Sequence, residues 1–420
     1  MGIIFYHIKH FSIGGEFMKV AIITTGYLPV PPCNGGAVET LCYSLMKENL
    51  INQKINITTY SIYDSKLTDY DLSQSKIVKV SFVYKLLDIL LYFFAKYILR
   101  KKKVMSYRYI FRRLRFLKKT SKDISKNDYD IILLENHYTE FMIFKWFKNF
   151  EKYKGRIYYH VHNIPSGTYG CEEYIKNAKF LCVSNYIKKY TLEYFNLNAS
   201  QLKVLRNAVD SKLFNNDLTN INVNQLKNKL NIDSNKKIIL FTGRLSKEKG
   251  IIELISAIEK IKRDDFVLLV IGSYFYDTKV KDEFSHNLGN LIKNNENKII
   301  FTGYVPYEQI SCYYKIADFA VLPSIWDDPA PLTIIESLQC GLPIITTNSG
   351  GIPEYVSKES AIILQRDEKI IENLKNSIEY LLNDSKKRDV MSEAALDISK
   401  NWSCKSYYYD FINLIGDIDE

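Results

Sequence analysis

Short apolar runs alternate with amphipathic stretches along most of this chain, and this alternation constrains the fold more than any other feature. The apolar runs are rich in Ile, Val and Leu, and the stretches between them repeat apolar residues at helical spacing. Such alternation predicts βαβ units, in which parallel strands form a sheet that helices cover on both faces. We therefore expect an α/β protein with parallel sheets.

The alternation occurs in two series, separated by residues 207–235, which are rich in Asn, Asp and Lys. In the first series, strands are expected at 19–25, 56–61, 130–135, 156–162 and 180–184, with helices at 38–49 and 185–194. In the second, strands are expected at 238–242, 266–271, 298–302, 319–322, 343–347 and 361–364, with helices at 250–260, 307–317 and 332–339. We predict two Rossmann-like domains facing each other across a cleft. Because open parallel sheets bind ligands beyond the carboxyl ends of their strands, functional residues are expected in the loops that follow strands.

The expected domain boundaries follow these series. Residues 18–205 would form the N-terminal domain, 206–385 the C-terminal domain, and 386–420 a helical tail that packs back on the N-terminal domain. Residues 1–17 lack the order of a signal peptide and are expected to be a disordered extension. Because Met18 directly precedes the first apolar strand, we expect it to be the natural start.

Cysteine and charge exclude several function classes. The seven cysteines are odd in number and never two residues apart, which favours reduced thiols in a reducing compartment over disulfides or zinc sites. The net charge is +10, yet residues 85–119 alone hold twelve Lys/Arg and one acid, Asp88. The rest of the chain is therefore close to neutral, and it shows no nucleic-acid reading motif. No nucleic-acid partner is expected.

The basic segment 85–119 suggests a membrane surface. Residues 86–99 are apolar but contain Asp88 and Lys96, which disfavours a spanning helix. From residue 100 the sequence alternates cations with apolar and aromatic residues, namely Tyr107, Tyr109, Phe111, Leu114 and Phe116. This pattern is typical of an interfacial helix on anionic lipid; the alternative is a solvated helix of the N-terminal domain. We expect a cytoplasmic protein attached peripherally to the inner face of the cell membrane.

Two loops of the first series carry candidate site residues. The loop after the first strand ends in Asn34-Gly35-Gly36, and adjacent glycines before a helix allow close approach to a phosphate or sugar, although a tight turn is the plain alternative. His160 and His162 point the same way on a strand. With no acid or cysteine nearby in the sequence they make a weak metal site. We expect His162 to be a hydrogen-bonding group at the strand end, with a buried structural histidine as the alternative.

In the second series, Arg244 and Lys249 lie five residues apart on a turn at a helix start. Two cations placed this way suit a diphosphate, because charge-assisted contacts to its oxygens contribute roughly 1.5–3 kcal/mol each without a metal. The alternative is a solvated loop. Of its two lysines, Lys247 and Lys249, we expect Lys247 to be the more solvated. Tyr304 and Val305 follow another strand, where a nucleobase could rest against the backbone, or the chain could simply turn.

The stretch 327–356 is the most informative part of the second series. Asp328 lies in a Pro-rich loop, and Glu336 follows eight residues later on an expected helix. Acids accept hydrogen bonds from hydroxyls, and a helix N-terminus favours phosphates. The stretch therefore suits a sugar joined to a nucleotide. By contrast, the Asp-x-Asp strings at 69–71 and 128–130 lie in polar connections, and we expect no metal there.

These motifs together resemble the retaining glycosyltransferases of family 4, which have the GT-B fold. The resemblance covers 18–395. It rests on Asn34-Gly35-Gly36, Val183-Ser184-Asn185, Arg206-Asn207-Ala208-Val209-Asp210, Gly243-Arg244, Lys249-Gly250, Phe301-Thr302-Gly303-Tyr304-Val305 and the pair Asp328 and Glu336. Residues 298–356 resemble those of bacterial spore-coat and surface-polysaccharide members.

The resemblance implies that 18–205 is the acceptor domain and 206–385 the nucleotide-sugar domain, and it implies a role for each of these residues. Arg244 and Lys249 would hold the diphosphate, and Glu336 would accept from the ribose hydroxyls. Asp328, where the family more often has Glu, would meet the donor-sugar hydroxyls. The remaining implied contacts are backbone amides near Leu332 and Thr333 for sugar and phosphate, Gly35 and Gly36 for phosphate, His162 for the donor sugar, and Tyr304 and Val305 for the base.

The sequence thus predicts a retaining, metal-independent hexosyltransferase with no cofactor. It would use a nucleotide sugar, UDP-linked in our expectation, to extend a glycan or lipid-linked acceptor in bacterial surface polysaccharide synthesis. Two alternatives remain: a non-catalytic sugar-nucleotide-binding or coat protein of the same fold, and a GT-B-type nucleotide-sugar epimerase.

Overall fold

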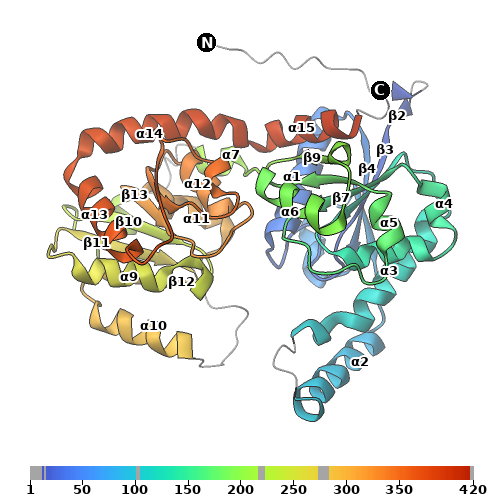
Figure 1. The fold of residues 1–420 in the computed structure, drawn as a ribbon, viewed down its shortest axis with the longest axis horizontal. Helices are drawn as coiled ribbons and strands as arrows, with labels where there is room; N and C mark the ends of the chain where they lie inside the picture. Colours follow the sequence, from blue (N-terminus) through green and yellow to red (C-terminus); the bar gives the residue numbers. More distant parts are fainter. Residues whose placement is uncertain (1–11, 14–15, 101–104, 216–222, 273–282, 417–420) are drawn as a thin grey trace. The chain divides into compact units, whose positions relative to one another are not determined.

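The computed structural model describes residues 12–13, 16–100, 105–215, 223–272 and 283–416 (Figure 1). The described residues form two compact units. Those up to 183, together with 187–205 and 407–416, form the first, and those within 184–186 and 206–406 form the second. Each unit is built around its own parallel sheet.

The first unit contains a seven-stranded sheet in the order β5-β4-β3-β6-β7-β8-β9, with every pair parallel. Its strands are β3 (Lys19–Ile23), β4 (Asn56–Ile62), β5 (Ser75–Val78), β6 (Ile131–Glu135), β7 (Ile157–Val161), β8 (Lys179–Cys182) and β9 (Leu202–Val204). Every residue of β6 and β7 is buried, as expected for central strands that helices cover on both faces.

The helices of the first unit follow its strands. They include α1 (Ala37–Asn52), α2 (Phe82–Phe93), α3 (Ile110–Ile124), α4 (Asn149–Tyr153), α5 (Glu172–Lys176) and α6 (Asn185–Phe195). The last helix, α15 (Cys404–Gly416), returns to this unit from Tyr407 onward. There the Tyr408 hydroxyl donates to Asn49 Oδ1 at 2.8 Å and accepts from the Lys54 amide at 3.1 Å. These contacts fix the end of the chain against α1.

The second unit contains a six-stranded parallel sheet in the order β12-β11-β10-β13-β14-β15. Its strands are β10 (Lys237–Thr242), β11 (Phe266–Ile271), β12 (Ile299–Gly303), β13 (Phe319–Leu322), β14 (Ile344–Thr347) and β15 (Ala361–Leu364). Its helices include α7 (Ser211–Asn215), α8 (Val223–Lys229), α9 (Ile251–Lys260), α10 (Glu283–Asn294), α11 (Tyr307–Lys315), α12 (Leu332–Gln339), α13 (Ile370–Asn383) and α14 (Ser385–Ser399). The order changes direction between β10 and β13, so the loops after these two strands lie together at the carboxyl edge.

The predicted α/β class with two parallel-sheet domains is confirmed. The strands β5 and β9 were not predicted; both lie at the edges of the first sheet, where short, partly exposed strands carry little apolar signal. Within the tail expected at 386–420, α14 contacts α12 in the second unit, and residues from Tyr407 belong to the first. Residues 1–11 and 14–15 of the expected disordered extension lie outside the described part, whereas Ser12–Ile13 and Glu16–Phe17 form an antiparallel pair.

The basic segment divides into two parts. The second half of α3 belongs to the core of the first unit, where Phe116 and Leu117 are fully buried. Assigning Phe116 to a lipid surface was therefore wrong, because its ring packs against the backbone at Gly26. By contrast, α2 and the π-helix Phe94–Ile98 carry exposed apolar side chains. None of the helices in the described ranges is long and apolar enough to cross a bilayer.

Gly250, at the start of α9, tests how closely the loops after β10 and β13 approach each other. Its φ is 70°, and a Cβ there would lie 1.9 Å from the Pro323 carbonyl oxygen. We expect Gly250→Ala to lower the free energy of unfolding by at least about 2 kcal/mol, measured by urea denaturation. The matched control is Gly289→Ala in α10, where a Cβ meets nothing within 4 Å. It should be neutral or stabilising by up to about 1 kcal/mol. Equal effects would contradict the close approach.

Candidate functional site

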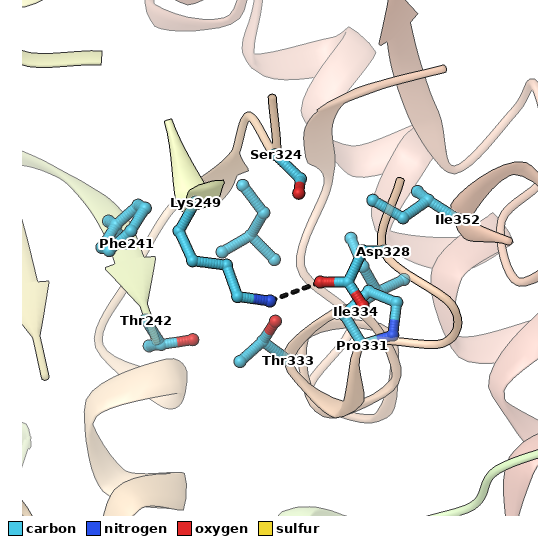
Figure 2. Close-up of a pocket in the computed structure, with 10 residues that line it drawn as sticks. Phe241, Thr242, Lys249, Ser324, Asp328, Pro331, Thr333, Ile334 and Ile352 are labelled. Carbon is cyan, nitrogen blue, oxygen red and sulfur yellow. Dashed lines mark hydrogen bonds and ion pairs between the residues drawn. The ribbon is translucent and has the colours of Figure 1, made fainter. Parts of the chain in front are cut away.

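A cation and an acid from distant parts of the sequence meet in the second unit. Lys249 ends the 3-10 turn Lys247–Lys249 after β10, and Asp328 lies in the loop between β13 and α12. Lys249 Nζ donates to Asp328 Oδ2 in an ion pair (Figure 2). Asp328 is only 6% exposed, so its charge depends on this partner for compensation. The two predicted loops therefore form one site.

A small pocket surrounds this ion pair. Figure 2 shows the Thr242 and Thr333 hydroxyls on the same side of the pocket as the Lys249 amine. The pocket is lined by Phe241, Thr242, Lys249, Leu322, Ser324, Asp328, Pro331, Thr333, Ile334 and Ile352. An apolar wall with a few convergent polar groups is typical of a small-molecule site.

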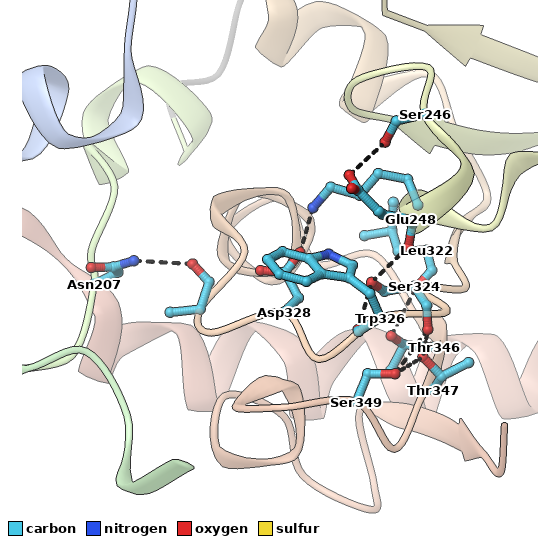
Figure 3. Close-up of polar contacts among 12 residues, drawn as sticks. Asn207, Ser246, Glu248, Leu322, Ser324, Trp326, Asp328, Thr346, Thr347 and Ser349 are labelled. Atoms are coloured by element: carbon cyan, nitrogen blue, oxygen red, sulfur yellow. Dashed lines mark hydrogen bonds and ion pairs between the residues drawn. The ribbon is translucent and has the colours of Figure 1, made fainter. Parts of the chain in front are cut away.

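Backbone contacts hold the two loops together beside the pocket (Figure 3). The Ile325 amide donates to the Glu248 carbonyl at 2.9 Å, and Ser324 Oγ donates to the same oxygen at 3.2 Å. Glu248 immediately precedes Lys249, so these contacts fix the backbone from which the lysine extends. Preorganisation of this kind lowers the cost of binding a charged ligand.

The Gly350-Gly351 turn fixes the acid loop from its other side. The Gly351 amide donates to the Asp328 carbonyl at 2.8 Å, and a Cβ at Gly351 would lie 2.0 Å from the Pro329 carbonyl oxygen. The hydroxyls of Thr347 and Ser349 also donate to the Ser324 carbonyl, at 2.5 and 2.8 Å (Figure 3). The glycine pair thus allows the tight packing that positions Asp328.

Glu336 lies behind the pocket on α12 and is buried. Tyr314 donates to Glu336 Oε2 at 2.6 Å, and the Tyr314 hydroxyl lies 2.7 Å from Thr242 Oγ1. A chain of hydrogen bonds therefore joins the pocket wall to the carboxyl group. Burial raises the pKa of Glu336 to about 7, although the hydroxyls of Tyr314 and Tyr307 oppose the shift. The sequence did not reveal Tyr314, because nothing in α11 marks it as different from other buried tyrosines.

Other predicted residues of the second unit lie outside the pocket lining. Arg244 is exposed on the loop after β10, and Tyr304 is 73% exposed after β12, next to the half-buried Val305. Leu332 begins α12 but does not line the pocket, whereas its neighbours Pro331 and Thr333 do. Of the predicted residues, the pocket therefore brings together Lys249, Asp328 and Thr333. Glu336 is linked to the pocket wall by the hydrogen bonds through Tyr314.

In the first unit, His162 belongs to a buried cluster that the sequence did not predict. Glu135 ends β6, and its Oε2 lies 3.1 Å from His162 Nε2 and 3.2 Å from His160 Nδ1. This acid is distant in the sequence but adjacent in the fold, so the expectation that the two histidines lack an acid ligand was wrong. Burial alone would raise the pKa of Glu135, but His160 and His162 lower it to about 2. Burial and His160 lower the pKa of His162 to about 4.

The predicted glycine loop lies in the same unit and supports another buried acid. Gly36 has a φ of 113°, and a Cβ there would lie 2.1 Å from Glu39 Oε2. Gly35, with a φ of 73°, has open space around it. Burial raises the pKa of Glu39 to about 7, and the charge of Glu135 adds to that shift.

The sequence does contain a signal for Glu135 that the prediction missed: it is a lone acid at the end of a run of four apolar strand residues.

Residues 222–397 match the family model for Glycosyl transferases group 1. The chain is 27% identical to spore coat protein SA of Bacillus subtilis over 377 residues. This alignment covers 89% of this chain and 92% of that protein. These findings confirm the predicted glycosyltransferase domain and enzyme class.

Two solved structures share the fold. A glycosyltransferase from Rickettsia africae superposes with a TM-score of 0.73 at 20% identity, covering 96% of this chain and 98% of that one. Anabaena Alr3699/HepE, solved in complex with UDP, superposes with a TM-score of 0.69 at 16% identity, covering 95% and 99%. The similarity extends over nearly the whole of each chain.

The raised pKa of Glu336 predicts a pH dependence of stability. Between pH 4.5 and about 7 the unfolded carboxyl is ionised while the folded one is protonated, so the folded state binds more protons. The contribution of Glu336 to stability is therefore complete below pH 4.5 and is lost as the pH rises through 7. From pH 4.5 to 8, wild type should lose roughly 2–3 kcal/mol more than Glu336→Gln in urea denaturation.

The control for this measurement is Glu259→Gln, at an exposed position of α9. Glu259→Gln should keep the wild-type pH dependence of stability. If Glu336→Gln also kept that pH dependence, the Glu336 carboxyl group would not be protonated in the folded state near neutral pH.

Proposed function

We propose that this chain, whose residues 222–397 form a group 1 glycosyl transferase domain, moves a hexosyl group from a nucleotide sugar to a glycan or lipid-linked acceptor. The observation that carries the proposal is the ion pair of Lys249 and Asp328 in the pocket of the second unit. A diphosphate needs a fixed cation, and a sugar needs an acceptor for its hydroxyls. The pocket holds one of each side by side.

In this proposal, donor binding exchanges the partners of the ion pair. The diphosphate takes the Lys249 amine, and the Asp328 carboxylate accepts from a donor-sugar hydroxyl instead. Both charges keep a partner throughout, which avoids leaving a buried charge uncompensated. The Thr242 and Thr333 hydroxyls of the pocket wall offer further hydrogen bonds. Leu332 and Thr333 begin α12, where backbone amides without intrahelical partners favour a phosphate or sugar oxygen.

The proposed reaction breaks the bond between the sugar anomeric carbon and the diphosphate and forms a bond to the acceptor oxygen on the same face. Negative charge builds up on the departing diphosphate, and the acceptor proton passes to it. Lys249, with Arg244 on the same loop as a second cation, stabilises that charge without a metal. We assign Glu336 to the ribose and Tyr304 with Val305 to the base. In the first unit, His162, Gly35 and Gly36 are proposed to contact sugar and phosphate.

UDP is our choice of nucleotide because HepE, which shares the fold, was solved with UDP. A surface glycan is our choice of product because the relative of 27% identity is a spore coat protein. Nucleotide release from a panel of donor sugars tests both choices. Release that requires an acceptor supports a transferase, donor isomerisation would indicate an epimerase, and binding without either would indicate a non-catalytic protein.

We further propose that α2 and the π-helix Phe94–Ile98 dock on anionic lipid at the inner face of the cell membrane. Their exposed apolar side chains line a groove formed by Leu87, Leu90, Leu91, Phe93, Phe94, Tyr97, Ile98 and Phe111. A neighbouring groove presents Lys85, Arg108 and Arg112. Asp88, the one acid of segment 85–119, accepts from the Phe111 amide at 2.7 Å and so caps α3. The remaining charges of the segment are all positive; Arg113 is paired with the buried Glu140, and each exposed cation near anionic lipid adds roughly 1 kcal/mol.

Removing the pocket cation tests the transferase proposal. Lys249→Ala should lower turnover by about 10²-fold, because it removes one preorganised group that stabilises the leaving diphosphate. The control is Lys247→Ala, which removes an exposed lysine two residues earlier and should leave turnover within about twofold. Nucleotide release measures both variants. Turnover of Lys249→Ala within a few-fold of wild type would refute the assignment.

Removing one exposed apolar side chain tests the membrane proposal. Leu90 on α2 is 65% exposed, and Leu90→Asp should weaken co-sedimentation with anionic vesicles at least about tenfold. Ile51→Asp is the matched control, because Ile51 is 66% exposed on α1, outside the basic segment. Binding should also weaken as salt rises. Binding that ignores the anionic lipid content of the vesicles would contradict the proposal.

A further inference from the structure

Three side chains with metal-ligand chemistry converge at the carboxyl edge of the first sheet. Glu135 ends β6 and is paired in register with His160 on β7, and His162 follows two residues later on the same face. Glu135 Oε2 lies 3.2 Å from His160 Nδ1 and 3.1 Å from His162 Nε2, and the two nitrogens lie 3.1 Å apart. All three residues are buried.

Hydrogen bonds cannot make all three contacts of this triangle favourable while Glu135 is a carboxylate. His160 Nδ1 also lies 3.3 Å from Glu135 Oε1, so each histidine could donate to its own carboxylate oxygen, but the contact between the two nitrogens would remain. Each ring nitrogen offers one position in its plane, which holds either a proton or a lone pair. If both nitrogens facing the carboxylate are protonated, the two N–H groups lie against each other. If only one nitrogen is protonated, the lone pair of the other faces the carboxylate oxygen. If neither is protonated, both lone pairs face it. One of the three contacts is therefore unfavourable in each of these states, and such a contact is costly when buried.

A single cation satisfies all three contacts at once. Around a tetrahedral Zn²⁺ with bonds of about 2.0–2.1 Å, ligand atoms lie roughly 3.3 Å apart, close to the separations within this triangle. Two histidines and one glutamate also form a known zinc ligand set that leaves a fourth position open. Imidazole ligands favour first-row transition metals, whereas Mg²⁺ and Ca²⁺ prefer oxygen ligands.

We propose that Glu135, His160 and His162 bind one divalent transition-metal ion of the Zn²⁺ class. This site is separate from the pocket of Lys249 and Asp328, which lies in the second unit. The ion has no part in the proposed transfer reaction. Instead, it occupies His162 Nε2, which removes that nitrogen from hydrogen bonding with a sugar and leaves only Nδ1 of the ring. This inhibitory consequence rests on the proposed function of His162, whereas the binding itself does not.

Titration with Co²⁺ tests the site directly, because Co²⁺ substitutes for Zn²⁺ and absorbs visible light. The full chain, first treated with a chelator and dialysed, should bind one equivalent and develop the visible bands of a four- or five-coordinate ion. The near-ultraviolet band that thiolate ligands add should be absent, which separates this site from the free cysteines. Zn²⁺ should abolish the bands by competition.

Two variants and a matched control locate the ion. Glu135→Gln and His160→Gln should each weaken Co²⁺ binding at least about tenfold, while His286→Gln, an exposed histidine on α10, should bind like wild type. Because a buried variant can fail to fold, the thermal midpoint of wild type with and without Zn²⁺ gives a variant-free measurement. We expect the midpoint to rise with Zn²⁺.

Two outcomes would overturn the site: no Co²⁺ bands together with no Zn²⁺-dependent shift in the thermal midpoint, or bands that are the same in folded Glu135→Gln. Inhibition of nucleotide release by Zn²⁺ tests the consequence separately. If Zn²⁺ binds but does not inhibit, the metal site stands and the proposed role of His162 fails. If the chain releases no nucleotide at all, the Co²⁺ titration still decides the site.

Discussion

The ion pair between Lys249 and Asp328 is the interaction on which the candidate site depends. It joins the loop after β10 to the loop after β13, where the strand order of the second sheet changes direction. The Glu248 carbonyl and the Gly351 amide hold the two loops from opposite sides. A buried pair of this kind contributes little net stability, because desolvation offsets attraction. Its value lies in keeping two opposite charges fixed before a ligand arrives.

A second feature of the pocket is the buried acid behind it. The hydroxyls of Tyr314 and Thr242 link the Glu336 carboxyl group to the pocket wall. Its pKa near 7 means that a small change in its surroundings alters its charge. A ligand hydroxyl that donates to the carboxylate would favour the ionised form, and so donor binding and proton release would be linked. The first unit also contains two buried acids, Glu39 and Glu135. The pKa of Glu39 is raised, whereas that of Glu135 is lowered.

The sequence predicted the central strands and the loops that carry the site, because buried parallel strands have a strong apolar signal. It could not predict which loop residues meet. Lys249 and Asp328 are 79 residues apart, and only the folded sheet brings them together. Glu135 was missed for the same reason, since its histidine partners lie on the next strand. Phe116 was misassigned because alternating cations and aromatics occur both on lipid surfaces and on helices with one buried face.

Fixed cations in the second unit are proposed to hold a pyrophosphate without a bound metal ion. Calorimetric titration of the full chain with UDP and with uridine, in a chelator and again with Mg²⁺, tests this claim most directly. We predict that UDP binds at least about tenfold more tightly than uridine in the chelator, because charge-assisted contacts to the diphosphate contribute roughly 1.5–3 kcal/mol each. Mg²⁺ should change this ratio little. Equal affinities, or UDP binding that requires Mg²⁺, would contradict the account.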